Sequence, residues 1–148
     1  MKIAKSLANF AAASVAAMVF GAGIAHAAPP NPILYLTAQE HYSANGKHWV
    51  RHRYDVFNKD QYPADMFAAA PGLPPCGANT NSSRTWVDFF DSTGKRLYGF
   101  CALGNPANLG SIWFATEEGT VPPSWVYIEM TDRQTNTKYK SNLADTTN

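Results

Sequence analysis

The amino-acid sequence predicts an all-β protein, specifically an antiparallel β-sandwich of about seven strands with one disulfide bond. Three observations predict this fold class. Runs rich in β-branched and aromatic residues recur along the chain, and clusters of Pro, Gly and Asn separate them. No long amphipathic helix is visible beyond residue 27. The only two cysteines, Cys76 and Cys101, lie before and within the clearest hairpin of the chain.

The first 27 residues have the features of a cleaved secretory signal peptide. A short basic region contains Lys2 and Lys5, an apolar region follows, and Ala25-His26-Ala27 matches an Ala-x-Ala cleavage site. An uncleaved membrane anchor is the alternative, but the segment is rich in Ala and Gly and no basic stop follows it. We therefore expect residues 28–148 to form a single domain that is periplasmic or secreted and does not span the membrane.

The charge balance argues against two classes of partner. The chain carries a formal net charge of +1 at pH 7, and removal of the signal peptide would take away two of its lysines. No basic patch is visible, so neither nucleic acid nor anionic lipid is an expected partner. The sequence leaves the oligomeric state open.

An exported chain with two cysteines most simply forms a disulfide. A Cys76–Cys101 bond would stabilise the fold by roughly 3.5 kcal/mol on the chain-entropy description, less any strain. The alternative, a reactive thiol or half of a metal site, would favour a Cys-x-x-Cys spacing that these residues lack.

The first hairpin is predicted around Asn45-Gly46, the strongest two-residue hairpin signal. Residues 33–41 and 47–57 read as its strands. With Asn45-Gly46 at the turn, Tyr42 faces Trp49 and Glu40 faces Arg51. An aromatic pair and an opposite-charge pair then lie across the ladder, each contributing a few tenths of a kcal/mol. Alternatively, the two strands belong to different sheets and residues 43–47 form a corner.

Residues 86–90 and 96–103 are expected to form the central hairpin, with Gly94 supplying a positive φ in its turn. Residues 58–81 contain four prolines and two glycines, which exclude a continuous strand or helix. Within them, residues 64–70 are predicted to make one or two helical turns. Met66, Phe67 and Leu73 are expected to cover an open end of the core.

The last third of the chain is predicted to add three strands. Residues 111–115 form a short buried strand, and residues 125–131 alternate strictly, with Val126, Ile128 and Met130 on one face. Residues 137–142 return antiparallel to them. Residues 143–148 are expected to be a frayed polar tail.

This pattern resembles immunoglobulin and fibronectin type III domains. The resemblance rests on the strand end Tyr54-Asp55-Val56-Phe57-Asn58 and on the terminal hairpin of residues 122–142. It is a resemblance of architecture, which implies a seven-stranded sandwich and assigns no functional residue.

Glu40, His41, His48, His52 and Asp55 form the only dense group of metal-capable residues. Strand residues four apart are separated by about 13 Å, which is too far for one ion to bind both His48 and His52. We therefore expect solvent-exposed strand histidines rather than a metal site, and no cofactor.

Catalysis is not predicted. Asp88 and Asp91 are an odd number of residues apart, so on a regular strand they face opposite sides. No Gly-x-Ser-x-Gly elbow, phosphate-binding Gly loop or His-Glu-x-x-His motif is present.

Aromatic residues are the more suggestive feature. Tyr42 and Trp49 flank the first hairpin turn, and Trp125 and Tyr127 lie opposite the apolar face of their strand. Exposed aromatics of this kind stack on sugars or anchor protein partners. We expect a binding module of the cell envelope whose partner meets the Tyr42/Trp49 end or the loop of residues 63–75. The alternatives are a carbohydrate-binding module or small secreted hydrolase, and a structural envelope protein.

Overall fold

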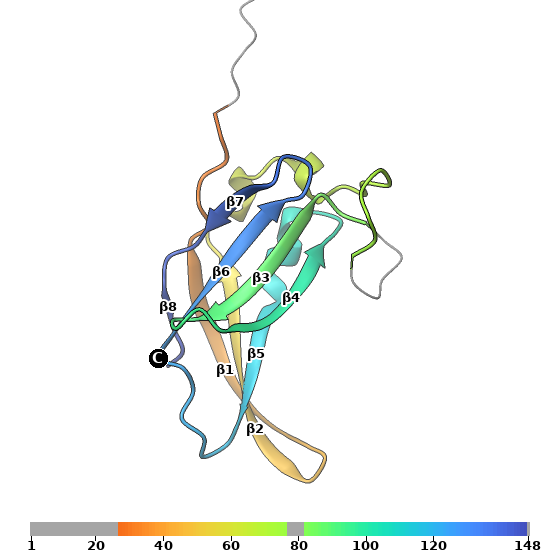
Figure 1. The fold of residues 1–148 in the computed structure, drawn as a ribbon. Helices are drawn as coiled ribbons and strands as arrows, with labels where there is room; N and C mark the ends of the chain where they lie inside the picture. Colours follow the sequence, from red (N-terminus) through yellow and green to blue (C-terminus); the bar gives the residue numbers. More distant parts are fainter. Residues whose placement is uncertain (1–26, 77–81, 148) are drawn as a thin grey trace, which may run out of the picture.

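The computed structural model describes residues 27–76 and 82–147, and this part of the chain is all-β (Figure 1). It contains eight strands in two antiparallel sheets. The three-stranded sheet has the order β1-β2-β5, with β1 (Leu34–Ala44), β2 (Lys47–Val56) and β5 (Ile112–Glu117). The five-stranded sheet has the order β4-β3-β6-β7, with β4 (Arg96–Ala102), β3 (Thr85–Asp91), β6 (Trp125–Asp132) and β7 (Thr137–Lys140); β8 (Ala144–Asp145) also pairs with β6. Three short 3-10 helices lie in the connections: η1 (Lys59–Gln61), η2 (Ala64–Phe67) and η3 (Pro106–Ser111).

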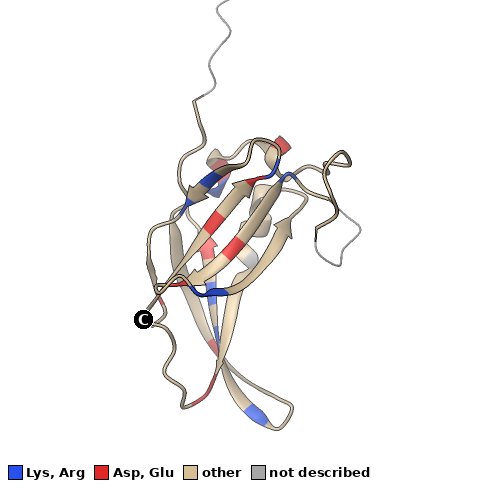
Figure 2. Cartoon of the chain, in the orientation of Figure 1, with Lys and Arg blue, Asp and Glu red and all other residues tan. Residues whose placement is uncertain are grey.

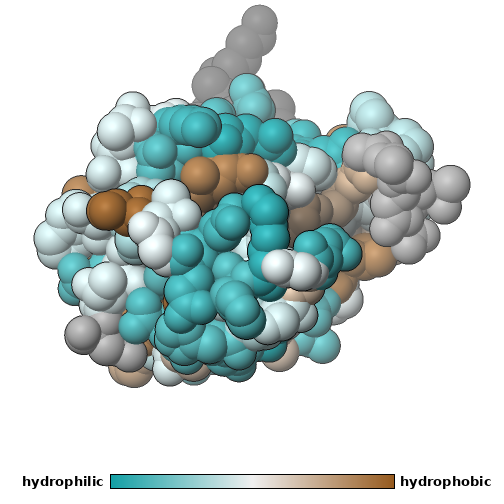
Figure 3. Space-filling model, turned by 90° about the horizontal axis from the view of Figure 1, so that it is seen from below, coloured by the Kyte–Doolittle hydropathy of each residue, from teal (hydrophilic) through white to brown (hydrophobic). Residues whose placement is uncertain are grey.

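The first hairpin has the predicted register. Tyr42 pairs with Trp49 and Glu40 with Arg51 in the β1–β2 ladder. Asn45 and Gly46 take positive φ values of 54° and 73°, the conformation that a two-residue turn of this type needs. The corner alternative is therefore wrong, because both strands belong to one sheet. The hairpin end extends beyond the five-stranded sheet (Figure 1), and the molecule viewed from that end is largely hydrophilic with separate apolar patches (Figure 3).

One apolar core lies between the two sheets. Alternate residues of each strand point inward, as the two-residue period of a strand requires. Tyr54 of β2 packs against Phe89 of β3 with ring centroids 5.5 Å apart, and Phe114 of β5 lies 5.7 Å from Phe89. On β6, the predicted inward residues Val126, Ile128 and Met130 are fully buried.

The connection between β2 and β3 covers one end of the core, as the sequence predicted. Met66 and Phe67 of η2 are buried, and Thr85 Oγ1 donates a hydrogen bond of 2.6 Å to the Met66 carbonyl. Leu73 is only half-buried. The disulfide between Cys76 and Cys101 is confirmed, with 5.8 Å between the two Cα atoms, and it ties this connection to β4.

The expectation of a frayed tail is wrong. Ala144 and Thr146 are buried, and β8 pairs with Trp125 and Val126 at the start of β6. The polar groups of the tail form hydrogen bonds with neighbouring strands rather than with solvent. It also adds a short eighth strand to the seven that the sequence predicted.

The predicted signal peptide, apart from Ala27, lies outside the described residues. Within residues 27–76 and 82–147 we find no helix with the length and apolarity that crossing a membrane requires.

Candidate binding site on the open side of the two sheets

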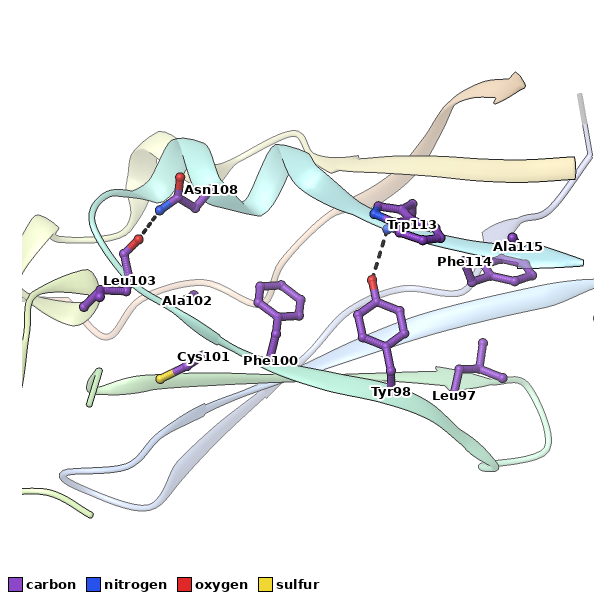
Figure 4. Close-up of a pocket in the computed structure, with 10 residues that line it drawn as sticks. All are labelled: Leu97, Tyr98, Phe100, Cys101, Ala102, Leu103, Asn108, Trp113, Phe114 and Ala115. Carbon is purple, nitrogen blue, oxygen red and sulfur yellow. Dashed lines mark hydrogen bonds between the residues drawn. The ribbon is translucent and has the colours of Figure 1, made fainter. Parts of the chain in front are cut away.

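A groove of about 730 Å³ runs between the edge strands β4 and β5 (Figure 4). We call it the open side. Each sheet contributes one wall, and the inward-facing side chains of β4 point across the groove toward β5. The lining is mostly apolar and aromatic and comprises Leu97, Tyr98, Phe100, Cys101, Ala102, Leu103, Asn108, Trp113, Phe114 and Ala115.

The groove is open because of the route that the chain takes from β4 to β5. Residues 103–111 form a turn and η3, so they cross between the sheets without adding a strand to either. Asn105 accepts a hydrogen bond of 2.9 Å from the Ala107 N–H at the start of η3, and Asn108 Nδ2 donates to the Leu103 carbonyl. In the described part of the chain, β4 therefore pairs only with β3, and β5 only with β2.

Tyr98 bridges the two walls. The Trp113 N–H of β5 donates a hydrogen bond of 3.0 Å to the Tyr98 hydroxyl of β4 (Figure 4). Burial raises the pKa of Tyr98 to about 12, so the phenol stays neutral at physiological pH. This hydrogen bond links the two walls at one point along the groove. It also satisfies the Trp113 N–H, a backbone donor at the free edge of β5.

An arginine flanked by two aromatic rings lies at the rim of the groove. The Arg51 guanidinium carbon is 4.7 Å from the ring centroid of Tyr42 and 4.7 Å from that of Trp113. The carboxylate of Glu40 forms ion pairs with both neighbouring arginines. Its Oε2 lies 3.6 Å from Arg51 Nη1, and its Oε1 lies 2.8 Å from Arg53 Nε. We call these five residues the arginine face. One carboxylate between two guanidinium groups leaves this surface with an excess of positive charge.

The structure separates the four aromatic residues that the sequence singled out. Tyr42 and Trp49 lie on the outer surface of the three-stranded sheet, where the Trp49 Nε1–H donates to the Ala44 carbonyl at 3.4 Å. Trp125 and Tyr127 lie on the outer surface of the five-stranded sheet. They therefore form two separate surfaces, and the structure brings Tyr42 together with Trp113 instead.

Sequence reasoning missed Trp113, whose side chain is 42% exposed. A signal for it was present. In the run of residues 112–115, Ile112 and Phe114 share the apolar face, so Trp113 is placed on the opposite one. Its neighbour on that face, Arg51, belongs to a distant segment, and the sequence does not give the register between the two strands.

Tyr127 has little free ring surface. Its ring stacks on Phe90 with centroids 5.1 Å apart, and Lys140 Nζ lies 4.3 Å from the Tyr127 centroid. Trp125, at 44% exposed, is more accessible. A stacking ligand on this sheet would therefore meet Trp125 first.

The prediction that the strand histidines are solvent-exposed is wrong for His52. This side chain is 1% exposed and stacks on Phe114 with centroids 4.6 Å apart. Its Nδ1 lies 2.8 Å from the Thr146 carbonyl and its Nε2 lies 3.3 Å from the Thr116 hydroxyl, so a neutral ring satisfies both partners. Burial lowers the pKa of His52, the hydrogen bond to Thr146 opposing it. Tyr54 and Val56, two and four residues on, mark the same face as apolar and could have revealed this burial.

His41 and His48 are exposed, and His41 lies 3.4 Å from Glu118. Among the described residues, no three His, Cys, Asp or Glu side chains are grouped closely enough to hold a metal ion.

The two carboxylates considered for catalysis have structural partners. Asp88 accepts a hydrogen bond of 2.6 Å from Arg96. Asp91 organises the β3–β4 turn, and the hydrogen bond from Thr93 lowers the pKa of its carboxyl. Acidic and basic positions are interspersed over both sheets (Figure 2).

Compared with protein-family models, with curated proteins and with solved structures, the chain matches none.

Proposed function

We propose that the protein is a non-catalytic binding module of the cell envelope, and that it captures a protein partner on the arginine face and the adjoining open side. The observation that carries this proposal is the position of Arg51 between Tyr42 and Trp113 at the rim of an apolar groove. Trp, Tyr and Arg are the residues enriched where protein–protein binding energy concentrates. The exported location rests on the signal-peptide pattern of residues 1–27.

The arrangement also favours a protein partner over a sugar. A guanidinium held between two rings is already oriented, so little side-chain entropy is lost when it meets a carboxylate. The same stacking covers one face each of Tyr42 and Trp113, which reduces the ring surface open to a sugar.

The test is photo-crosslinking in the cell envelope, with a photoreactive residue in place of Leu97, which lines the groove near Ala115 (Figure 4). We expect a discrete adduct with one protein, and we expect Trp113→Ala and Arg51→Ala to abolish it. Trp125→Ala is the matched control, because Trp125 is 44% exposed against 42% for Trp113 and lies on the other sheet. Melting curves of all three variants establish that they fold. An adduct that survives Trp113→Ala, or the lack of any protein adduct, would contradict the proposal.

A carbohydrate-binding module is the second candidate, and the exposure of Trp125 favours it. In that case a glycan array should show binding that Trp125→Ala removes and Trp113→Ala leaves intact. Loss of binding in Trp113→Ala would thus support the protein-binding module, and loss of binding in Trp125→Ala would support the carbohydrate-binding module.

We further propose that the fold is of the immunoglobulin and fibronectin type III kind. The order β1-β2-β5 corresponds to strands A, B and E, and β3, β6 and β7 correspond to C, F and G, with β4 as an added strand beside C. The disulfide differs from the inter-sheet bond of antibody domains, because Cys76 lies in a connection. An experimental structure with another strand order would exclude this assignment.

A further inference from the structure

We propose that the partner binds by adding an extended strand to the free edge of β5, with apolar side chains entering the groove and an acidic side chain reaching Arg51. This inference rests on the proposed function and specifies the chemistry of the partner. Strand addition to a sheet edge gains affinity from main-chain hydrogen bonds and specificity from alternate side chains.

The backbone of β5 presents its free groups toward the open side. The Trp113 N–H donates to Tyr98 across the groove, whereas the Glu118 N–H donates to the His48 carbonyl within the three-stranded sheet. Backbone direction alternates in an antiparallel strand, so Ala115 and Glu117 point the same way as Trp113.

This edge has two defined limits. At one limit Tyr98 occupies the Trp113 N–H, and at the other the Glu117 carbonyl accepts a hydrogen bond of 3.0 Å from the Thr120 N–H. Between them lie the Trp113 carbonyl, both backbone groups of Ala115 and the Glu117 N–H, for which β5 has no strand partner in the described part of the chain. An added antiparallel strand centred opposite Ala115 uses all of these groups and leaves the Tyr98 bridge intact.

The side chains of the added strand would alternate between two environments. Those on the inner face lie beside Phe114 and enter the groove, where Tyr98 and Phe100 are half-buried rather than fully covered. Those on the outer face lie beside Ala115, which pairs directly with Arg51. Two strand spacings separate the added strand from Arg51, about 10 Å, and the small Ala115 leaves the path across them clear.

Charge complementarity decides which outer side chain fits. Arg51 and Arg53 share the single carboxylate of Glu40. A Glu on the added strand supplies the missing negative charge, whereas a Lys there would be repelled. The structure therefore specifies a segment with apolar residues facing the groove, Glu opposite Ala115 and no Pro at the paired positions. The carboxylate of Glu117, further along the same face of β5, is already paired with Lys47 at 2.8 Å.

The experiment uses three synthetic peptides of equal length as probes for the folded protein. One alternates Val with Glu, the second has the same composition in blocks, and the third alternates Val with Lys. We expect the first to bind at least about tenfold more tightly than either of the others. We also expect it to slow hydrogen exchange at the Ala115 and Glu117 amides. Equal binding of all three peptides, or unchanged exchange at these amides, would overturn the proposal.

Two variants sharpen the test. Ala115→Pro removes an N–H that faces the groove, so it should abolish binding while the strand still pairs with β2. Lys138→Pro is its matched control, because the Ser141 N–H donates to the Ile128 carbonyl and the backbone of Lys138 therefore points away from β6. Arg51→Glu should invert the preference toward the Lys peptide. Binding that is indifferent to both Ala115→Pro and Arg51→Glu would exclude strand addition at β5.

The two proposals fail in different ways. If crosslinking captures a partner through Trp113 but Ala115→Pro leaves that adduct unchanged, the binding module stands and strand addition falls. If no Trp113-dependent partner is captured, the proposed function falls.

Discussion

Beside β1 and β7, the C-terminal segment (residues 141–147) closes the gap between the sheets, whereas no described segment covers the gap beside β4 and β5. We call the first the closed side. There the Leu34 N–H donates to Asn142 Oδ1 at 2.8 Å, and Asn142 Nδ2 donates to the Leu34 carbonyl at 2.9 Å. The Thr146 carbonyl lies 2.8 Å from His52 Nδ1 and accepts a hydrogen bond of 2.9 Å from Gln39.

The difference shows how the same kind of edge can be protected or left available. An unpaired edge strand is a template for pairing with another chain, and proteins protect such edges by covering them or with Lys residues. At the edge of β1, the Asn142 side-chain amide makes the two backbone hydrogen bonds that a neighbouring strand would make. The edge strand β7 is short and carries Lys138 and Lys140. On the open side, β5 carries neither Lys nor Pro. Its edge therefore lacks the protection that β1 and β7 have, which is the basis of the proposed strand addition.

The largest effect is expected at the disulfide, which fixes one end of the open side. Replacing Cys76 and Cys101 by Ser should destabilise the fold by about 3 kcal/mol and lower Tm by several degrees, because the unfolded chain regains loop freedom. Thermal melting followed by circular dichroism measures this loss. The wild-type protein in reductant should match the variant, and identical melting with and without reductant would mean that the bond adds no stability.

The closed side should be the next most sensitive. Asn142→Ala leaves both backbone groups of the buried Leu34 without their partner and should cost about 2 kcal/mol. Asn108→Ala removes a comparable amide, the donor to Leu103 on the open side, and should cost about 0.5 kcal/mol or less because that site is exposed. Urea unfolding of the two variants measures the difference. Equal losses would contradict the distinction between the two sides.

Acid should weaken the closed side through His52. Burial places the pKa of His52 in the folded protein below its ordinary value of 6.5, so the folded chain binds this proton less readily than the unfolded chain. Its contribution to stability is therefore complete above pH 6.5 and is lost as pH falls through the folded-state pKa. Unfolding free energies measured between pH 8 and 5 should show this decline.

His52→Gln should flatten that pH profile, and His41→Gln, a change at an exposed histidine of the same hairpin, should leave it unaltered. A decline that persists in His52→Gln would assign it to other groups.

A small effect on stability is expected at Tyr98. Tyr98→Phe removes the acceptor for the Trp113 N–H but keeps the ring, so the global loss should stay below about 1 kcal/mol. Hydrogen exchange at the Trp113 amide should accelerate much more than exchange in the core. Unchanged exchange at Trp113 would show that the bridge does not hold the open side.

The sequence predicted the local features well, and their physical basis explains why. Strand positions follow from side-chain alternation, and the register of the first hairpin follows from Asn45-Gly46, because a two-residue turn fixes which residues face each other. The Cys76–Cys101 bond followed from the predicted export of the chain and from its having only two cysteines. The strand positions and the hairpin register depend on residues that are close in the chain, and the disulfide depends on the single pairing that two cysteines allow.

The candidate site was predicted only in part, because it depends on non-local register. Tyr42 was among the predicted binding residues, but Arg51 and Trp113 join it only once β5 has paired with β2. The burial of His52 likewise depends on Phe114 and on Thr146, which come from two later segments.

The sequence by itself determined the all-β class, the positions of seven of the eight described strands and the disulfide, because strand alternation, turn chemistry and a unique cysteine pair act locally or without alternatives. Only the tertiary structure decided which side of the two sheets is closed. That choice depends on whether the C-terminal segment returns to β1 or crosses to β5, and a polar segment of few residues carries no periodicity that favours either route. The Asn142 amide and the Thr146 carbonyl acquire their roles only where Leu34 and His52 are already in place to receive them.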